Sequence, residues 1–146
     1  MSVVGEDFLK FSENLLNHSS TEIEYRNVIS RLYYSLIHVT GRCLAPSAPK
    51  KYHTEMERYL KMPDRHDPNE LIPSLELKAL GELLAARRAK RVVADYKLEE
   101  DVMRADADGE MEISKLIHQK LHAYQLQEKG ISSSQEIQNG KLSKES

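Results

Sequence analysis

The chain has few of the residues that build small β-rich or cross-linked folds. Its 146 residues include no tryptophan, one cysteine, six glycines and five prolines. So few turn-forming residues argue against an all-β fold, which needs short strands joined by frequent turns. A lone cysteine, Cys43, cannot form an intrachain disulfide, and no Cys/His spacing typical of a zinc site surrounds it. We therefore expect helices, in one domain large enough to bury its own core.

Two further absences bear on where the protein works. No stretch approaches the roughly 20 apolar residues needed to span a bilayer, and the first residues lack the basic start and apolar run of a secretion signal. The formal net charge is −2, whereas proteins that grip duplex nucleic acid along their length carry a basic surplus. We expect a cytoplasmic protein with no membrane partner, in which a local basic patch makes any contact with nucleic acid.

Apolar residues at helical spacing predict helices over about 6–17, 22–44, 52–62, 73–95 and 99–127. Thr21, followed three residues later by Glu24, matches a capping box, and Pro73 suits the first turn of a helix. The stretch 106–109 is a weak point of the last helix. Residues 128–146 are almost devoid of apolar side chains and predict a flexible polar tail. The predicted organisation is thus a helical bundle over 1–127 and a tail over 128–146.

The second predicted helix is apolar over about half of its circumference when residues 25–44 are placed about 100° apart, and Val28, Leu32 and Leu36 lie on this apolar arc. A helix of this kind is mostly buried, in its own bundle or in an oligomer. Polar groups at its margin must be paired or line a wet cleft. Either Arg31 and His38 pair with carboxylates of a neighbouring helix, or they belong to a functional site. The remaining polar stripe consists of Asn27, Arg31, Tyr34, Ser35, His38 and Arg42.

The inward line of the fourth predicted helix changes from apolar to cationic in its last two turns. Arginine presents a planar fork of donors that suits carboxylates or phosphates. Cations are also favoured at the C-terminus of a helix by the helix dipole. The pattern indicates either dipole-matched, partly paired arginines or a basic cleft for a phosphate backbone. Along this line Leu77, Leu80 and Leu84 are followed by Arg87, Arg88, Arg91 and Asp95.

Three segments, in this order along the chain, carry a family resemblance. Residues 30–38 (SRLYYSLIH) match an SR-x-YY-x-x-x-H helix, and residues 51–56 (KYHTEM), with His53, look like the start of the next helix. Residues 91–96 (RVVADY) match an R-x-x-ADY helix ending. In these motifs the chain resembles the HEPN family (higher eukaryotes and prokaryotes nucleotide-binding) over about residues 20–100.

The resemblance implies an all-α, antiparallel bundle of four or five helices that forms a symmetric dimer, with the polar stripes in a shared cleft. Many HEPN proteins are metal-independent endoribonucleases of toxin–antitoxin pairs or phage defence, and such toxins are often paired with a nucleotidyltransferase-type antitoxin. Others bind a nucleotide or a partner without catalysis. The nuclease branch usually has an arginine with a histidine four to six residues later. This chain departs from that pattern, because no histidine follows Arg91 until His118.

On this basis we expect a HEPN-type endoribonuclease, a toxin or phage-defence effector, that needs no metal or cofactor. A histidine transfers protons near neutral pH, and arginines stabilise charge on a phosphate. The alternatives are a non-catalytic HEPN module for nucleotide or partner binding and oligomerisation, and a helical adaptor whose tail docks elsewhere. We predict that Arg31, His38 and Arg91 are catalytic, and that Arg87, Arg88, Asp95, Tyr96, Tyr34 and Asn27 bind the RNA substrate.

The remaining histidines give weaker indications of a functional site. His53 is expected to pair locally at the start of a helix, and His66 lies in a loop. His118 and His122 have the i, i+4 spacing of a metal-binding pair, but no third ligand is in view. We therefore predict a solvated helix face for both.

Overall fold

The computed structural model describes residues 2–145, with side chains placed for residues 2–128. The predicted all-α class is confirmed, since no strand occurs in this part of the chain. Within the same range, no helix carries an apolar stretch that would span a bilayer. The elements are α1 (Gly5–Asn17), α2 (Glu22–Cys43), α3 (His53–Lys61), the 3-10 helix η1 (Pro63–Arg65), α4 (Ser74–Tyr96) and α5 (Arg104–Glu145).

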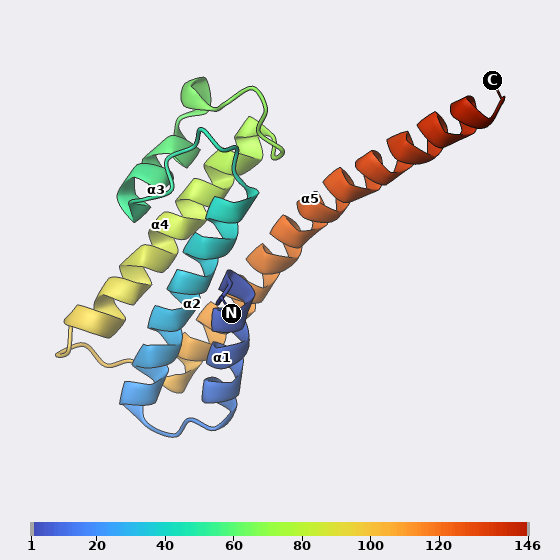
Figure 1. The fold of residues 1–146 in the computed structure, drawn as a ribbon. Helices are drawn as coiled ribbons and strands as arrows, with labels where there is room; N and C mark the ends of the chain where they lie inside the picture. The colour runs from blue at the N-terminus through green and yellow to red at the C-terminus, as the bar shows by residue number, and fades with distance from the viewer. Residues whose placement is uncertain (1, 146) are drawn as a thin grey trace.

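Helix α2 forms the centre of the bundle. α1, α4 and α5 all pack directly against it, and α3 packs on α4. Figure 1 shows that α1 and α4 run opposite to α2, whereas α5 runs in the same direction as α2. Val28, Leu32 and Leu36 of the predicted apolar arc are almost completely buried. At about 1.5–3 kcal/mol for each such side chain, burial of this arc is the main force that assembles the other helices on α2.

The predicted bounds of the first four helices agree with the observed ones to within one residue at each end. The last helix begins at Arg104 rather than near Glu99, because residues 97–103 form a loop. At its start, the Met103 N–H donates to Asp106 Oδ2 over 2.8 Å. The predicted weak point at 106–109 therefore lies in the first turns of α5, which it does not interrupt.

Two predicted helix starts differ in detail. Thr21 is the N-cap of α2, but its hydroxyl donates to Glu24 Oε1 (2.6 Å) instead of accepting a backbone N–H. The same carboxylate oxygen accepts the Ser20 N–H over 3.3 Å. Pro73 is the N-cap of α4 rather than its first helical residue. The predicted capping box at Thr21 and Glu24 thus forms in part only, and Pro73 lies just before the first turn of α4.

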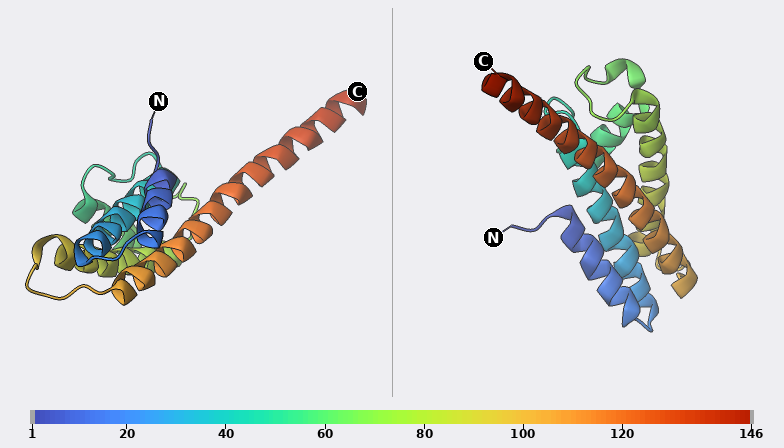
Figure 2. Two further views of the ribbon diagram at one scale, coloured as in Figure 1. Left: turned by 90° about the horizontal axis from the view of Figure 1, so that it is seen from below. Right: turned by 90° about the vertical axis from the view of Figure 1, so that its right-hand side faces the viewer.

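Helix α5 is much longer than the bundle. Its backbone continues from Arg104 to Glu145, and its second half projects away from the other helices (Figures 1 and 2). The predicted boundary at residue 127 therefore lies inside α5 and does not coincide with the end of a helix. Side chains beyond residue 128 lie outside the described part, so the flexibility of the 128–146 tail stays a prediction.

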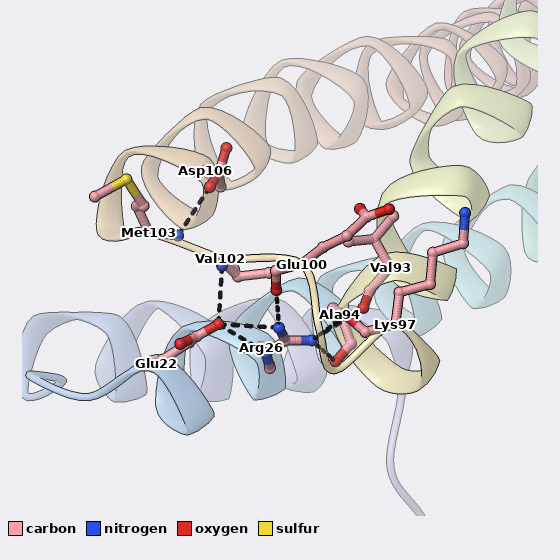
Figure 3. Close-up of polar contacts among 9 residues, drawn as sticks. All are labelled: Glu22, Arg26, Val93, Ala94, Lys97, Glu100, Val102, Met103 and Asp106. Atoms are coloured by element: carbon pink, nitrogen blue, oxygen red, sulfur yellow. Dashed lines mark hydrogen bonds and ion pairs between the residues drawn. The ribbon is translucent and has the colours of Figure 1, made fainter.

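A buried arginine outside the predicted polar stripe joins α2 to the end of α4 (Figure 3). Arg26 is 5% exposed. Its Nη1 donates to the carbonyl oxygens of Val93 (3.0 Å), Ala94 (3.1 Å) and Lys97 (3.3 Å), and its Nη2 donates to that of Glu100. The last carbonyls of a helix have no partner within the helix. Arg26 supplies that partner at the end of α4.

The carboxylate of Glu22 completes this arrangement. Glu22 Oε1 accepts from Arg26 Nη2 (2.9 Å) and from the Val102 N–H (2.9 Å). A buried guanidinium is stable only when its charge is neutralised and its donors are satisfied, and both conditions are met here. We call Arg26, Glu22 and the backbone groups they hold the Arg26 clamp. It fixes the end of α4 and the following loop against the first turns of α2.

Replacing Arg26 with methionine is expected to lower the free energy of unfolding by about 3 kcal/mol or more, because the buried carbonyls and the Glu22 carboxylate lose their donor. Urea unfolding followed by circular dichroism measures this. Arg42→Met is the control, since Arg42 forms an exposed pair with Glu6; its loss should cost less than about 1 kcal/mol. Equal stability of Arg26→Met and the wild-type protein would contradict the clamp.

His118 is buried, so the solvated face predicted for it was wrong. Its ring is 9% exposed, and Nε2 lies 2.5 Å from Oγ of Ser35, which is fully buried. α5 packs on α2, and the contact with Ser35 places the ring between these two helices. His122, one turn further along α5, is exposed as predicted. The two histidines therefore face different surroundings and do not share a ligand.

Burial lowers the pKa of His118 below its usual 6.5, because desolvation disfavours the imidazolium; Glu6 opposes this shift and Arg42 adds to it. The unfolded chain thus binds this proton at higher pH than the folded one. The neutral His118 ring therefore contributes to the stability of the folded protein above about pH 6.5. This contribution is lost as the pH falls from there through the pKa of His118 in the folded protein.

We expect His118→Gln to flatten the decline in melting temperature between about pH 7 and 5. His122→Gln should keep the wild-type slope, and equal slopes in both variants would refute this role of His118.

Candidate functional site

The polar stripe of α2 lies between α1 on one side and α4 on the other, and His53 at the start of α3 reaches it. Arg31 and Tyr34 are half-buried, and the guanidinium carbon of Arg31 lies 4.8 Å from the centre of the Tyr34 ring. His38 is exposed and stacks on Phe8 of α1, with ring centres 5.6 Å apart and planes 11° apart. Arg31, Tyr34 and His38 are spaced by three and four residues, so the helical period places them on one face.

The end of α4 brings a second arginine to the same face. Arg91 pairs with Asp95 one turn later, with Nε and Oδ2 2.7 Å apart. The guanidinium carbon of Arg91 lies 5.7 Å from the ring centre of Tyr34 and 5.4 Å from that of Tyr96. Burial lowers the pKa of Arg91, but the Asp95 carboxylate, Tyr34 and Tyr96 together outweigh burial, so the pKa of Arg91 is raised. Ser30 of α2 donates to Asp95 Oδ2 over 3.0 Å, which ties this pair to α2.

The first residue of α3 completes the group. The ring of His53 contacts Tyr33 and Tyr34 edge-on, with ring centres 5.6 and 6.0 Å apart. Burial lowers the pKa of His53, and the positive charges of Arg91 and His38 lower it further. His53 is therefore a neutral imidazole at pH 7 and can accept a proton. We refer to the whole set as the Arg31–Arg91 cluster: Arg31, Tyr34, His38, His53, Arg91, Asp95 and Tyr96.

The other two arginines predicted for a basic cleft do not join the cluster. Arg87 Nη1 donates to Glu110 Oε1 of α5 over 2.6 Å, and both side chains are nearly buried. Arg88 Nε and Nη2 donate to the two oxygens of Glu57 of α3, over 2.9 and 3.1 Å. Successive residues on a helix point about 100° apart, so Arg87 faces α5 while Arg88 faces α3. The cationic line of α4 is thus divided among three neighbours, and only Arg91 faces the cluster.

The remaining members of the predicted polar stripe have separate roles. Asn27 is exposed and donates to the carbonyl oxygen of Ile23 on its own helix (2.9 Å). Ser35 is buried against His118, and Arg42 pairs with Glu6 of α1. None of these three contacts the cluster through an observed hydrogen bond or ion pair between described side chains.

Arg31 is half-buried and has no carboxylate partner among the described side chains, whereas the other two arginines without one, Arg58 and Arg65, are exposed. Among the side chains placed for residues 2–128, Arg26, Arg42, Arg87, Arg88 and Arg91 all form salt bridges, whereas Arg31 forms none. The structural interpretation of the stripe required such a partner on a neighbouring helix. Arg31 instead rests on the Tyr34 ring, where a cation–π contact stabilises it without cancelling its charge. It is an uncompensated cation beside the aromatic rings of the cluster.

The sequence patterns missed two residues of this region. Ser30 adjoins Arg31 in the SR pair, and its role depends on the distant Asp95. His53 was predicted to pair locally, but it packs on the tyrosines of α2, which are about 20 residues away in sequence. The helical spacing of apolar residues cannot reveal either contact, since both contacts depend on how α3 and α4 are placed against α2. The signal that was available is that both residues belong to the segments of the family resemblance, 30–38 and 51–56.

No family model, no curated protein and no solved structure matches the chain.

The lowered pKa of His53 offers a direct test of the geometry. In an NMR titration His53 should titrate below pH 6.5, the usual value for a histidine. Arg91→Gln removes a neighbouring positive charge and should raise the pKa of His53. Arg58→Gln, which changes an exposed arginine on the same helix as His53, should leave this pKa unchanged. A pKa of His53 that is the same with and without Arg91 would contradict the proximity of the two side chains.

Proposed function

We propose that the chain is a HEPN-type metal-independent endoribonuclease whose Arg31–Arg91 cluster binds and cleaves RNA. The observation that carries the proposal is the uncompensated charge of Arg31 on the Tyr34 ring, next to Arg91. An arginine of this kind retains its capacity to bind an anion, whereas one that faces a carboxylate does not.

The proximity of the three HEPN-like segments also supports the proposal. Residues 30–38, His53 and residues 91–96 come from α2, α3 and α4, and their polar side chains meet in one place. A resemblance based on scattered motifs gains weight when the motifs converge on one group of polar residues. The family assignment itself still rests on those motifs.

In the proposed reaction the 2′-hydroxyl of a ribose attacks the adjacent phosphorus. A base removes the 2′ proton, the bond from phosphorus to the 5′-oxygen breaks, and an acid protonates the departing oxygen. The products are a 2′,3′-cyclic phosphate and a free 5′-hydroxyl. Arg31 and Arg91 stabilise the negative charge that develops on the phosphate oxygens. Asp95, held by Ser30, keeps Arg91 in position.

Two histidines are available for the proton transfers. His53 is held neutral by burial and by nearby positive charge, which suits the base. His38 is exposed, so solvent can supply its proton, and it suits the acid. A charge on the His38 ring lowers the pKa of His53 further, which keeps His53 available as the proton acceptor. Tyr96 presents an exposed ring on which the sugar or base of the substrate can rest, whereas Tyr34 holds Arg31 beside the phosphate.

The wider role follows from the family resemblance alone. A symmetric dimer would place two clusters about a two-fold axis and complete a shared cleft. In the cytoplasm such an enzyme would serve as a toxin or a phage-defence effector, with a nucleotidyltransferase-type antitoxin as its partner. Tyr96 is 67% exposed and is the residue that such a partner would modify.

One observation favours the second candidate, a non-catalytic module that binds a nucleotide or a partner. Arg91 is engaged by Asp95, and no histidine follows it four to six residues later, as the nuclease pattern requires. A cluster with only one uncompensated arginine is able to hold a phosphate without cleaving it. Cleavage assays separate the two candidates.

We expect purified protein to cleave single-stranded RNA in the presence of EDTA, and induced expression to arrest growth. Arg31→Ala and His38→Ala should each reduce cleavage by about 100-fold or more, as expected for loss of a phosphate-binding cation or a proton-transfer group. Denaturing gels measure the products, and circular dichroism verifies that the variants are folded.

Matched controls come from the same residue types outside the cluster. Arg58→Ala and His122→Ala alter an exposed arginine and an exposed histidine and should retain wild-type cleavage. Undiminished cleavage by both Arg31→Ala and His38→Ala would exclude the assigned roles. If wild-type protein binds RNA without cleaving it, and Arg31→Ala abolishes binding, the binding-module candidate is correct.

A further inference from the structure

The surface of the bundle has a hollow between α1 and α2 that the proposed reaction does not use. Its volume is about 400 Å³, and it is lined by Val3, Asp7, Phe8, Phe11 and Arg31. This volume lies within the usual range for pockets that bind small organic groups, about 300–1,000 Å³. Four of the five lining residues come from α1 or the segment before it, and α2 contributes the arginine.

The walls of this hollow are mostly aromatic and aliphatic, and they are exposed. Phe11 is 56% and Val3 71% exposed, which leaves a large apolar area in contact with water. Phe8 is half-buried, and one face of its ring is covered by His38 of the Arg31–Arg91 cluster. Exposed aromatic surface of this kind marks a place where a ligand or a partner binds.

The hollow is continuous with the cluster through two residues. Arg31 lines the hollow and also lies on the Tyr34 ring of the cluster. His38 stacks on Phe8, which lines the hollow as well. A molecule whose phosphate is bound by Arg31 therefore has its neighbouring group within reach of the aromatic wall.

We propose that the hollow is a nucleobase subsite, which receives the base next to the phosphate bound by Arg31. The inference rests on the proposed function, since it assigns part of the same RNA substrate. Once Arg31 is engaged by the first phosphate, the Asp7 carboxylate is the remaining charge on the wall, and it disfavours a second phosphate but not a neutral base. A flat, neutral base can stack on Phe11 while Arg31 at the edge holds the phosphate. Stacking of a base on an aromatic side chain is tolerant of sequence.

The experiment measures binding in the absence of cleavage. A short, fluorescently labelled single-stranded RNA with 2′-O-methyl groups cannot be cleaved by attack of the 2′-oxygen, and an abasic version retains its phosphates. Fluorescence anisotropy gives the dissociation constant of the full chain for each. Phe11→Ala should weaken binding of the base-containing RNA by about tenfold, the effect of losing one stacked base, and leave the abasic RNA unchanged.

Three further variants make the result specific. Phe11→Tyr retains the ring and should restore wild-type affinity, whereas Phe11→Leu retains only the apolar volume and should not. Ile23→Ala removes an apolar side chain that is 64% exposed but lies outside the hollow, and it should have no effect. Because Phe11 is more than half exposed, these changes should leave the fold intact.

The outcomes separate the subsite from the function on which it rests. If Arg31→Ala weakens binding of both RNAs but Phe11→Ala weakens neither, the subsite is wrong and the phosphate site stands. If wild-type protein binds neither RNA, both proposals fail. If Phe11→Ala instead changes the sedimentation of the protein while RNA binding is unaltered, the hollow is occupied by a second copy of the chain, and the subsite is again refuted.

Discussion

The packing of α2 against three other helices is the constraint that shapes this protein. Because α1, α4 and α5 all contact α2, little of its surface is open to polar side chains. A polar residue of α2 must therefore be satisfied inside the bundle or lie on the strip that stays open. Arg26 and Ser35 are satisfied inside, by the end of α4 and by His118. Arg31 and His38 lie on the strip, and this division places them where a ligand can reach them.

The two arginines of the cluster differ in their freedom to respond to a ligand. Arg91 is held by Asp95, which is itself held by Ser30, so its position is set before anything binds. Arg31 rests on the face of Tyr34 with no carboxylate to hold it in the described part of the chain. A preorganised cation costs little reorganisation during a reaction, whereas a movable one can adapt to the position of a phosphate. The cluster combines both kinds.

Much of the fold was predictable, because helical periodicity and capping residues depend only on nearby sequence. The first four helices were predicted in this way, as were the buried residues Val28, Leu32 and Leu36. The partners of polar side chains were not predictable, since each depends on a different helix. Arg87, Arg88 and Arg91 share one pattern in the sequence but face α5, α3 and α2 in the structure. His118 shows the same limit, because its burial depends on the packing of α5 against Ser35 of α2.

The Arg26 clamp also restricts how this chain can vary in length. It holds the carbonyl oxygens of Lys97 and Glu100 and, through Glu22, the N–H of Val102, so the α4–α5 connection is fixed at three points. An inserted or deleted residue there would break at least one of these bonds and displace α5 relative to Asp95 and Tyr96. The connection between α3 and α4 is tethered as well, because the Glu70 carboxylate accepts from the Ala45 N–H (3.0 Å) and from the Tyr59 hydroxyl (2.7 Å). Related chains are therefore expected to keep the length of the α4–α5 connection constant.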